Sequence, residues 1–418
     1  MNFQTHYAIL LIAVTSLPVW PYTQTVAQGL DGGYPNSNPA EATAALAGPA
    51  TVYTWSTATT GFAWLNASHW TGNPGHYPGV DANSKSIADG ASNDVAAFSS
   101  MAFAGSVVGI NFSFSYSSGL SDNTGANGSL TLGAIDYLST TNKSISIGDN
   151  SGTAGTFTLT GVTLNGVANT VLANEGSKSL TLAPRISGGT QDMTLAFANA
   201  SNNVVQVNGS GGIAISAAIE NGSGVAASLT KTGRGMLTLS HANTYTGGTT
   251  VQQGTLLVRN ATGSATGVGA VQVNLGTLKG VGKIDGAVTV GNGSNSGAAL
   301  LAGNNTSSPG VLTINSALTF EALSSYKCTL SRTSVKASQV SALGVIIDSG
   351  ATFTFVDIGN DTLPLGTVLT AINNTSASPI TGRFGNLPNG SIFTSNGNNF
   401  KVNYTGGTGN DLTLKVVP

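Results

Sequence analysis

The feature that most constrains this chain is a succession of short alternating segments that begins near Val107 and runs to the C-terminus. In each segment apolar residues alternate with Ser or Thr, and Gly, Asn or Asp residues separate one segment from the next. A period of two residues is typical of β-strands that bury one face. We therefore predict an all-β protein, with strands at 129–132, 144–147, 156–159, 179–182, 204–207 and 287–290.

Composition supports this prediction. Charged residues make up 8% of the chain, against about 25% in an average soluble protein, so few residues are available for exposed helix faces. The hydrophobic share of 40% excludes a disordered Gly/Ser chain. A net charge of −2, from 15 Lys and Arg against 17 Asp and Glu, gives no electrostatic reason to expect nucleic acid or an anionic membrane as a partner.

Either a sandwich or a solenoid could be built from strands of this kind. The scarcity of charge favours the solenoid, because equivalent residues of successive rungs lie beside one another and charged ladders would repel. We expect about twelve to fifteen rungs of roughly 20 to 25 residues each.

The N-terminus predicts export. An apolar run at 8–14 is followed by the small residues of 25–27, so residues 1–27 are interpreted as a secretory signal peptide, with a buried core segment as the alternative. Residues 28–50 are rich in Gly, Pro, Asn and Ala and are predicted to be a linker. We expect no transmembrane segment in the mature chain.

An aromatic cluster follows the linker. Trp55, Trp64 and Trp70 are three of the four Trp residues of the chain, and a cluster of this density needs a compact pocket of its own. We predict that the Trp-rich segment 51–106 covers the open N-terminal end of the solenoid, where unpaired strand edges would invite association.

The stretch 229–258 carries the most specific pattern. It reads Leu-Thr-Lys-Thr-Gly-Arg-Gly-Met-Leu-Thr-Leu-Ser, continues with His-Ala-Asn-Thr-Tyr-Thr-Gly-Gly-Thr-Thr-Val, and ends with Gly-Thr-Leu-Leu-Val at 254–258. Alternation places four side chains inside the coil, and the Asn-Thr-Tyr corner supplies side-chain hydrogen bonds where the ladder breaks. Lys231 and Arg234 are expected to face solvent, because burying an unpaired cation is costly. The four inward residues are Leu237, Leu239, Leu256 and Val258.

This stretch closely resembles the autotransporter-associated β-strand repeat of bacterial passenger domains. Looser resemblance continues in 276–284, 309–314 and 382–412, and the Trp-containing segment is similar to the opening segment that such proteins often carry. The resemblance implies a right-handed parallel β-helix outside the cell. We assign the solenoid to 107–343 and a C-terminal β segment that closes it to 344–418. The strands of a C-terminal translocator barrel are not expected, because none follow before Pro418.

Motifs for catalysis are present only as fragments. Ser324-x-x-Lys327, Ser121-Asp122-Asn123 and Lys231-Thr232-Gly233 imitate a penicillin-binding triplet, but their order along the chain is wrong. Scattered acids, among them Asp357 and Asp361, do not form the carboxylate pair of a glycoside hydrolase. We expect no catalytic residues, although a solenoid can bring acids of successive rungs together.

Metal and cofactor sites are not expected either. Residues 406–414 imitate a calcium-binding nonapeptide, but a glycine-rich turn is the simpler interpretation. The group His69, His76, Asp81, Asp89 and Asp94 lacks the tight spacing of a metal site. The single cysteine, Cys328, is interpreted as a buried thiol rather than an intermolecular bridge.

Together these patterns predict a secreted or cell-surface β-solenoid without catalytic activity, with a structural or adhesive role. Its partners would be surface glycans or copies of itself. The alternatives are a polysaccharide-active lyase or hydrolase, a glycan-binding β-helix, and a passive carrier of another domain.

Overall fold

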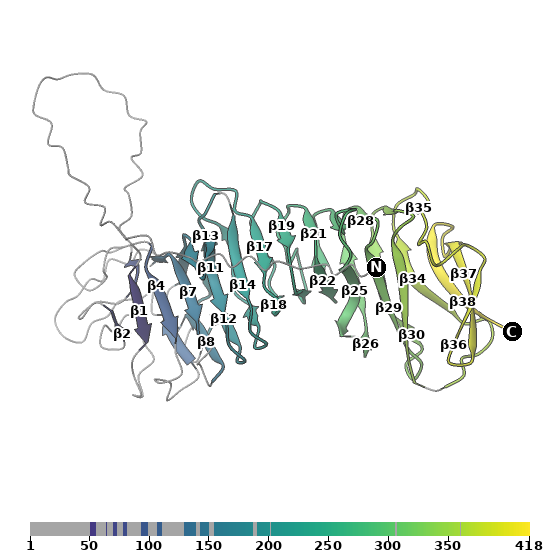
Figure 1. The fold of residues 1–418 in the computed structure, drawn as a ribbon, viewed down its shortest axis with the longest axis horizontal. Coiled ribbons are helices and arrows are strands. Elements are labelled where there is room, and N and C mark those ends of the chain that lie inside the picture. The colour runs from purple at the N-terminus through teal and green to yellow at the C-terminus, as the bar shows by residue number, and fades with distance from the viewer. Residues whose placement is uncertain are drawn as a thin grey trace, which may run out of the picture. The chain divides into compact units, whose positions relative to one another are not determined.

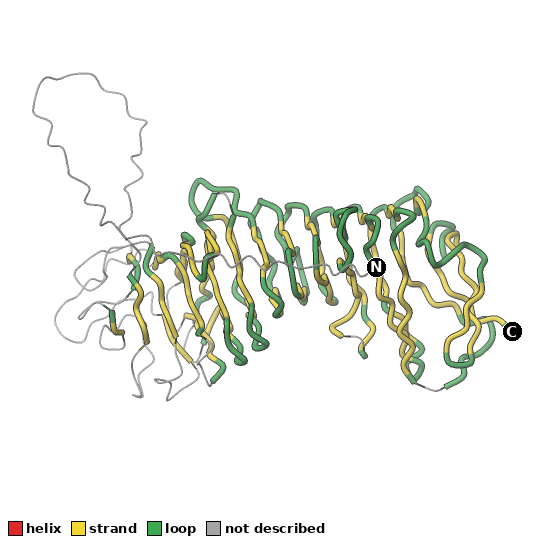
Figure 2. Tube along the Cα trace, viewed as in Figure 1, coloured by secondary structure: helices red, strands yellow, loops and turns green. Residues whose placement is uncertain are grey.

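The fold is all-β. The computed structural model describes residues 51–55, 64, 70–72, 78–81, 93–98, 107–110, 129–138, 143–149, 154–186, 190–200, 202–305, 307–359 and 361–418. They belong to one compact unit, Leu46–Pro418. Within these residues the chain forms strands joined by loops, and none of them forms a helix that could cross a membrane (Figure 2). The predicted signal peptide and linker lie outside the described residues.

Two long sheets run along the unit, and strands follow one another in chain order (Figure 1). The first contains β1 (Val52–Trp55), β2 (Trp70–Thr71), β4 (Val95–Phe98), β7 (Ala134–Tyr137), β10 (Val162–Leu164), β11 (Val167–Asn174), β14 (Asn203–Val207), β17 (Leu229–Thr232), β19 (Thr249–Val251), β21 (Val271–Val273), β24 (Val288–Val290), β28 (Leu318–Phe320), β32 (Val345–Ile347) and β35 (Thr381–Gly382). The second contains β5 (Val107–Ile110), β8 (Ile145–Asp149), β12 (Leu180–Arg185), β15 (Ile213–Ile215), β18 (Met236–Leu239), β20 (Thr255–Val258), β22 (Gly276–Gly280), β25 (Ala298–Asn305), β26 (Ser308–Pro309), β29 (Ser325–Ser331), β30 (Lys336–Ala337) and β33 (Thr352–Ile358).

Two shorter sheets contain the remaining strands. The first of these contains β3 (Val80–Asp81), β6 (Ser129–Leu132), β9 (Gly155–Leu159), β13 (Met193–Phe197) and β16 (Ala218–Asn221). The other contains β23 (Lys283–Ile284), β27 (Val311–Ile314), β31 (Gln339–Ala342), β34 (Val368–Asn374), β36 (Ile392–Ser395), β37 (Asn398–Gly406) and β38 (Asp411–Val417). Parallel pairing continues to β35, and β36–β38 add an antiparallel end to the last sheet.

The parallel coil confirms the predicted fold class. Of the fourteen strands of the first sheet, all but β2 and β10 pair in parallel with the equivalent strand of the next rung, which gives twelve rungs among the described residues. The rungs vary in length more than the expected 20 to 25 residues. Gln272 pairs with Thr289, 17 positions on, whereas Ile346 pairs with Thr381, 35 positions on. The difference lies in the corner loops, which lengthen without disturbing the ladder.

Inward-facing apolar residues form one continuous core. Leu237, Leu239, Leu256 and Val258 are fully buried, as the alternation predicts. Register places Leu237 beside Leu256 and Leu239 beside Val258, so each side chain packs on its equivalent in the next rung. Burying a side chain of this size contributes about 1.5–3 kcal/mol relative to exposure.

The corner of the repeat replaces a strand with side-chain hydrogen bonds. Asn243 Oδ1 accepts from the Ile219 N–H at 2.8 Å, and its Nδ2 donates to the Ala265 carbonyl. The buried Tyr245 hydroxyl lies 2.6 Å from Thr249 Oγ1. Gly267 has a φ of +64° and lies against the Tyr245 carbonyl, where a Cβ would clash. The predicted role of the Asn-Thr-Tyr corner is confirmed.

Lys231 contradicts the sequence-based expectation. Its side chain is fully buried, whereas Arg234 is exposed as expected. Lys231 Nζ donates to the carbonyl oxygens of Thr232 at 2.6 Å, Gly233 at 2.7 Å and Gln253 at 3.2 Å. The expectation was wrong because it considered only charged partners, whereas three turn carbonyls satisfy all three donors of the ammonium group.

Aromatic side chains gather at both ends of the coil. At the N-terminal end, Trp64 and Trp70 have ring centroids 4.9 Å apart, and Trp64 also contacts Phe157. At the other end, the buried Phe384 packs edge-on against Phe320 at 5.2 Å. The predicted compact pocket for the Trp residues is therefore present.

Two buried polar side chains lie in the last rungs. The guanidinium of Arg332 forms a bidentate ion pair with Asp357 and donates to the Asp361 and Ser395 carbonyls, which ties β29 to the loops that follow. Cys328 is buried and free, as predicted, and burial raises the pKa of its thiol to about 12.

Candidate functional site

The fragments of the penicillin-binding triplet do not meet. Ser324 lies beside β29 and its hydroxyl donates to the Glu321 carbonyl, while Lys231 lies inside the coil in β17, several rungs away. Residues 121–123 lie outside the described residues. The described parts of the motif therefore serve a turn and the core.

The nonapeptide-like stretch forms a hairpin turn between β37 and β38, where Gly406 pairs with Asp411. Asp411 Oδ1 accepts from the Asn374 N–H at 2.9 Å, so this carboxylate is used within the fold. In the other predicted group, Asp94 Oδ2 accepts from the Gly79 N–H at 2.9 Å, whereas His69, His76 and Asp89 lie outside the described residues.

Among the described residues, acids of successive rungs come together in two places. Glu321 and Asp348 follow the paired strands β28 and β32; burial and then the charge and hydrogen bond of Asp348 raise the pKa of Glu321. Burial, followed by the charge of Glu175, raises the pKa of Asp136 to about 6. The sequence could not show these pairs, because the residues in them are separated by an entire rung.

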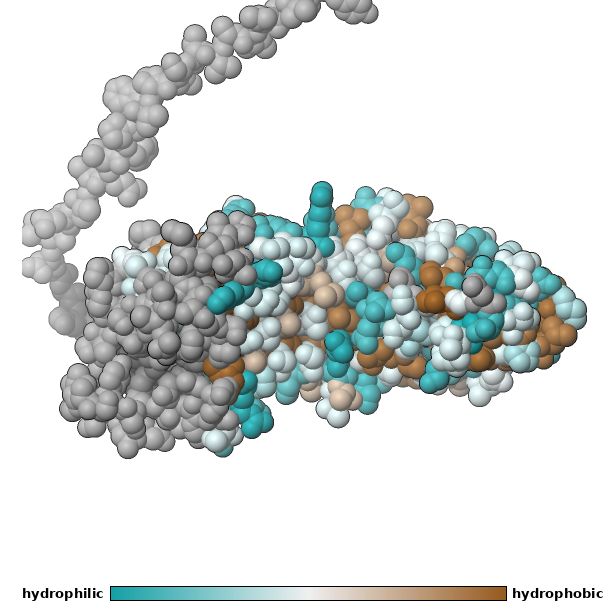
Figure 3. Space-filling view, turned by 90° about the horizontal axis from the view of Figure 1, so that it is seen from below, coloured by the Kyte–Doolittle hydropathy of each residue, from teal (hydrophilic) through white to brown (hydrophobic). Residues whose placement is uncertain are grey.

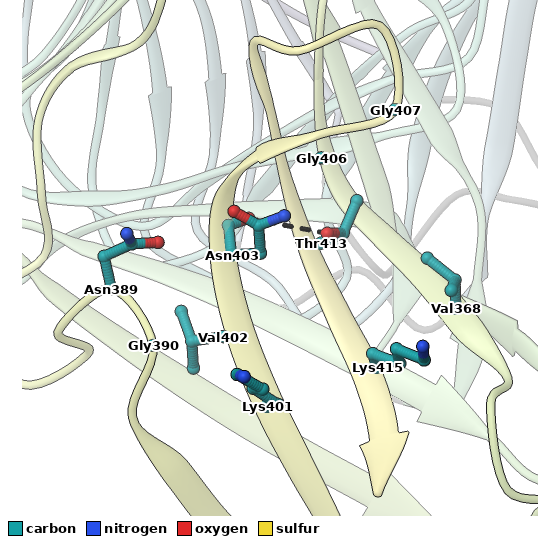
Figure 4. Close-up of a pocket in the computed structure, with 10 residues that line it drawn as sticks. All are labelled: Val368, Asn389, Gly390, Lys401, Val402, Asn403, Gly406, Gly407, Thr413 and Lys415. Carbon is teal, nitrogen blue, oxygen red and sulfur yellow. Dashed lines mark hydrogen bonds between the residues drawn. The ribbon is translucent and has the colours of Figure 1, made fainter.

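A shallow depression lies on the terminal antiparallel strands. Its volume is about 530 Å³. Strand pairing places Lys401 of β37 directly opposite Lys415 of β38, and Lys415 opposite Val368 of β34. The residues that line it are Val368, Asn389, Gly390, Lys401, Val402, Asn403, Gly406, Gly407, Thr413 and Lys415 (Figure 4).

The depression has the chemistry of an anion site. Both lysines are exposed, no carboxylate lines the depression, and neither lysine takes part in an ion pair between described residues. Like charges directly opposite one another destabilise a sheet, and an anion between them would remove that repulsion. Asn389 and Asn403 add amide groups at the rim, and the Asn389 Oδ1 already accepts from the Tyr404 N–H.

Sequence reasoning missed this site because its two charges are separated along the chain. Lys401 and Lys415 are each isolated in the sequence and become neighbours only through the β37–β38 hairpin. One feature of the sequence could have revealed the pair: two alternating segments flank a Gly-rich turn, and in a hairpin of this kind both lysines lie on the outer face.

A neutral polar ladder runs along the first sheet. In the first sheet the outward positions of five successive rungs are occupied by Thr230, Thr250, Gln272, Thr289 and Thr319. The described part of the face in Figure 3 shows many pale residues of intermediate hydropathy, with hydrophilic and hydrophobic residues scattered among them. This agrees with the uncharged ladders that composition predicts.

Comparison with known proteins adds one finding. Residues 229–258, the stretch from β17 through β20, match the family model of the passenger-associated-transport-repeat. No curated protein matches the chain. The match confirms, over these residues, the resemblance drawn from the sequence. Residues 229–258 of the chain therefore form a passenger-associated repeat.

Proposed function

We propose that the protein is a secreted or cell-surface structural coil, without catalytic activity, that adheres to acidic glycans through the Lys401–Lys415 depression. The paired lysines carry this proposal, because they lie directly opposite one another in a depression that no carboxylate lines. Neutral hydroxyl ladders add weak contacts along the coil, and weak contacts repeated along one polymer raise its overall affinity.

The proposal assigns a role to each part of the chain. In this proposal a signal peptide at residues 1–27 directs export, and a linker at 28–50 joins it to the folded part. The Trp-rich segment 51–106 caps the N-terminal end of the solenoid at 107–343, and the segment 344–418 closes the other end. The edge-on packing of Phe384 at one end and the Trp cluster at the other support the two end roles. The passenger-associated repeat supports export.

Affinity chromatography on immobilised polygalacturonate tests the proposed adhesion. The unaltered chain should be retained, and the double variant Lys401→Gln/Lys415→Gln should elute at clearly lower salt, because two cationic contacts are removed. The variant Lys283→Gln/Lys336→Gln is the matched control, since it removes two exposed lysines from other strands.

The control should elute with the unaltered chain, and a neutral dextran column should retain none of the three proteins. Equal elution of the two double variants would show that net charge, and not the depression, governs binding. Retention on dextran would point instead to the neutral ladders.

A further inference from the structure

The outer face of the terminal antiparallel strands carries apolar side chains on both sides of its two lysines. Strand pairing places Ile392 of β36 opposite Lys401 of β37, and Lys401 opposite Lys415 of β38. Lys415 in turn lies opposite Val368 of β34. Residues directly opposite one another project from the same face of a sheet, so these four side chains form one row across the strands, which we call the outer row.

The apolar members of the outer row are exposed. Ile392 is 57% exposed and Val368 is 55% exposed. Leu365, in the turn three residues before Val368, is 68% exposed. By contrast, the outward positions of the neighbouring strand β31 hold the neutral polar residues Gln339 and Ser341. Apolar residues that gather at the surface beside polar ones mark sites of contact with other molecules.

Two amide groups beside the lysines are oriented as donors. Asn389 Oδ1 accepts from the Tyr404 N–H at 2.9 Å, and Asn403 Oδ1 accepts from the Thr405 N–H at 2.9 Å. Neither Nδ2 group donates to a described residue, and both side chains line the depression together with the lysines (Figure 4). The surface therefore offers two ammonium groups and two amide NH₂ groups to oxygen acceptors.

We propose that the outer row binds an acidic glycolipid, with the acid group of the sugar on Lys401 and Lys415 and the start of the lipid chain on Val368 or Ile392. This inference rests on the proposed adhesion to acidic glycans and names a lipid as the carrier of the sugar. A free polysaccharide would contact the lysines and leave the apolar members of the row in water. A glycolipid contacts both, and binding at a lipid surface is strengthened by apolar burial and by attraction between cations and anionic head groups.

The small net negative charge of the chain does not oppose this binding. Exposed charges are largely screened beyond about 8 Å at physiological salt. No carboxylate lines the depression, so the two lysines set the local charge. Each lysine near an anionic lipid surface strengthens binding about 5-fold.

Flotation of the full chain with phosphatidylcholine vesicles tests the inference. Vesicles that contain sulfatide, a sulfated galactosylceramide, should carry the unaltered chain, and vesicles that contain galactosylceramide should not, because they present no acid group. The double variant Val368→Ser/Ile392→Ser should bind sulfatide vesicles at least about 10-fold more weakly, since it removes the apolar contacts. It should still elute from polygalacturonate with the unaltered chain, because both lysines remain.

The matched control is Val311→Ser/Ile346→Ser, which replaces the same two residue types at exposed positions of β27 and β32. This control should bind sulfatide vesicles as the unaltered chain does. Circular dichroism of each variant establishes that the coil is intact before binding is compared.

Several results would overturn the inference. If Val368→Ser/Ile392→Ser binds sulfatide vesicles undiminished, or if the control loses as much, the apolar members of the row do not contact the lipid. Equal binding to phosphatidylglycerol vesicles of the same charge would assign the row to anionic bilayers in general. If the unaltered chain binds polygalacturonate but not sulfatide vesicles, the inference alone is wrong, whereas binding to neither would overturn the proposed function with it.

Discussion

At the scale of single residues, Lys231 shows how a backbone can solvate a buried cation. Leu229 and Lys231 occupy alternate positions of β17 on the same face, and both are fully buried. The ammonium group replaces water with three carbonyl oxygens of the turns at 232–233 and 253. Removing the lysine would leave those oxygens without the donor that satisfies them.

Lys231→Met should therefore lower the free energy of unfolding by at least about 2 kcal/mol, because buried acceptors lose their donor. Arg234→Ala should change it by no more than about 0.5 kcal/mol, since Arg234 is exposed. Chemical denaturation measures both variants. Equal losses would mean that the contacts of Lys231 contribute no more than a surface side chain.

Comparing the unaltered chain with Lys231→Met over a range of pH also tests the titration of Lys231. Burial lowers the pKa of Lys231 to about 8 from an ordinary value of 10.5. Between these pH values the unfolded chain binds more protons at this position, so the free energy of unfolding should rise with pH relative to that of Lys231→Met. Below pH 8 the difference between the two proteins should be constant.

At the scale of elements, the sequence predicts the strands well and their neighbours poorly. Period-two patterns predict where the strands lie and which of their faces is buried. The Asn-Thr-Tyr corner predicts a turn that side-chain hydrogen bonds hold. Pairs such as Glu321–Asp348 and Lys401–Lys415 depend on register between distant positions. Corner loops of variable length set that register, and no local pattern encodes it.

The corner itself is testable through Asn243. Asn243→Ala should lower the free energy of unfolding by about 1–3 kcal/mol, because the Ile219 N–H and the Ala265 carbonyl lose their buried partner. Thr262→Ala, at an exposed position of the next corner, is the matched control and should be nearly neutral. The denaturation midpoints of the two variants are measured and compared. If Asn243→Ala leaves the midpoint unchanged, backbone hydrogen bonds alone hold the corner.

At the scale of the whole molecule, a parallel coil must protect the two ends of its ladders. β2 pairs antiparallel with β1 and covers the outer edge of the first sheet, while Trp64 packs against Phe98 and Phe157. At the other end β36–β38 turn the last sheet antiparallel. An unprotected edge presents free N–H and C=O groups on which another chain can pair.

Deleting residues 51–92 removes β1, β2 and β3 and leaves β4 as the terminal strand of the first sheet. The truncated chain should associate, because the edge of β4 and the aromatic faces of Phe98 and Phe157 become accessible. Sedimentation velocity should detect oligomers while circular dichroism retains the β signal of the remaining rungs, as expected when each rung contacts only its neighbours. A chain lacking only 28–50 is the control. If both deletions sediment as monomers of equal thermal stability, the Trp-rich segment does not cap the coil, and the remaining rungs protect their own edge.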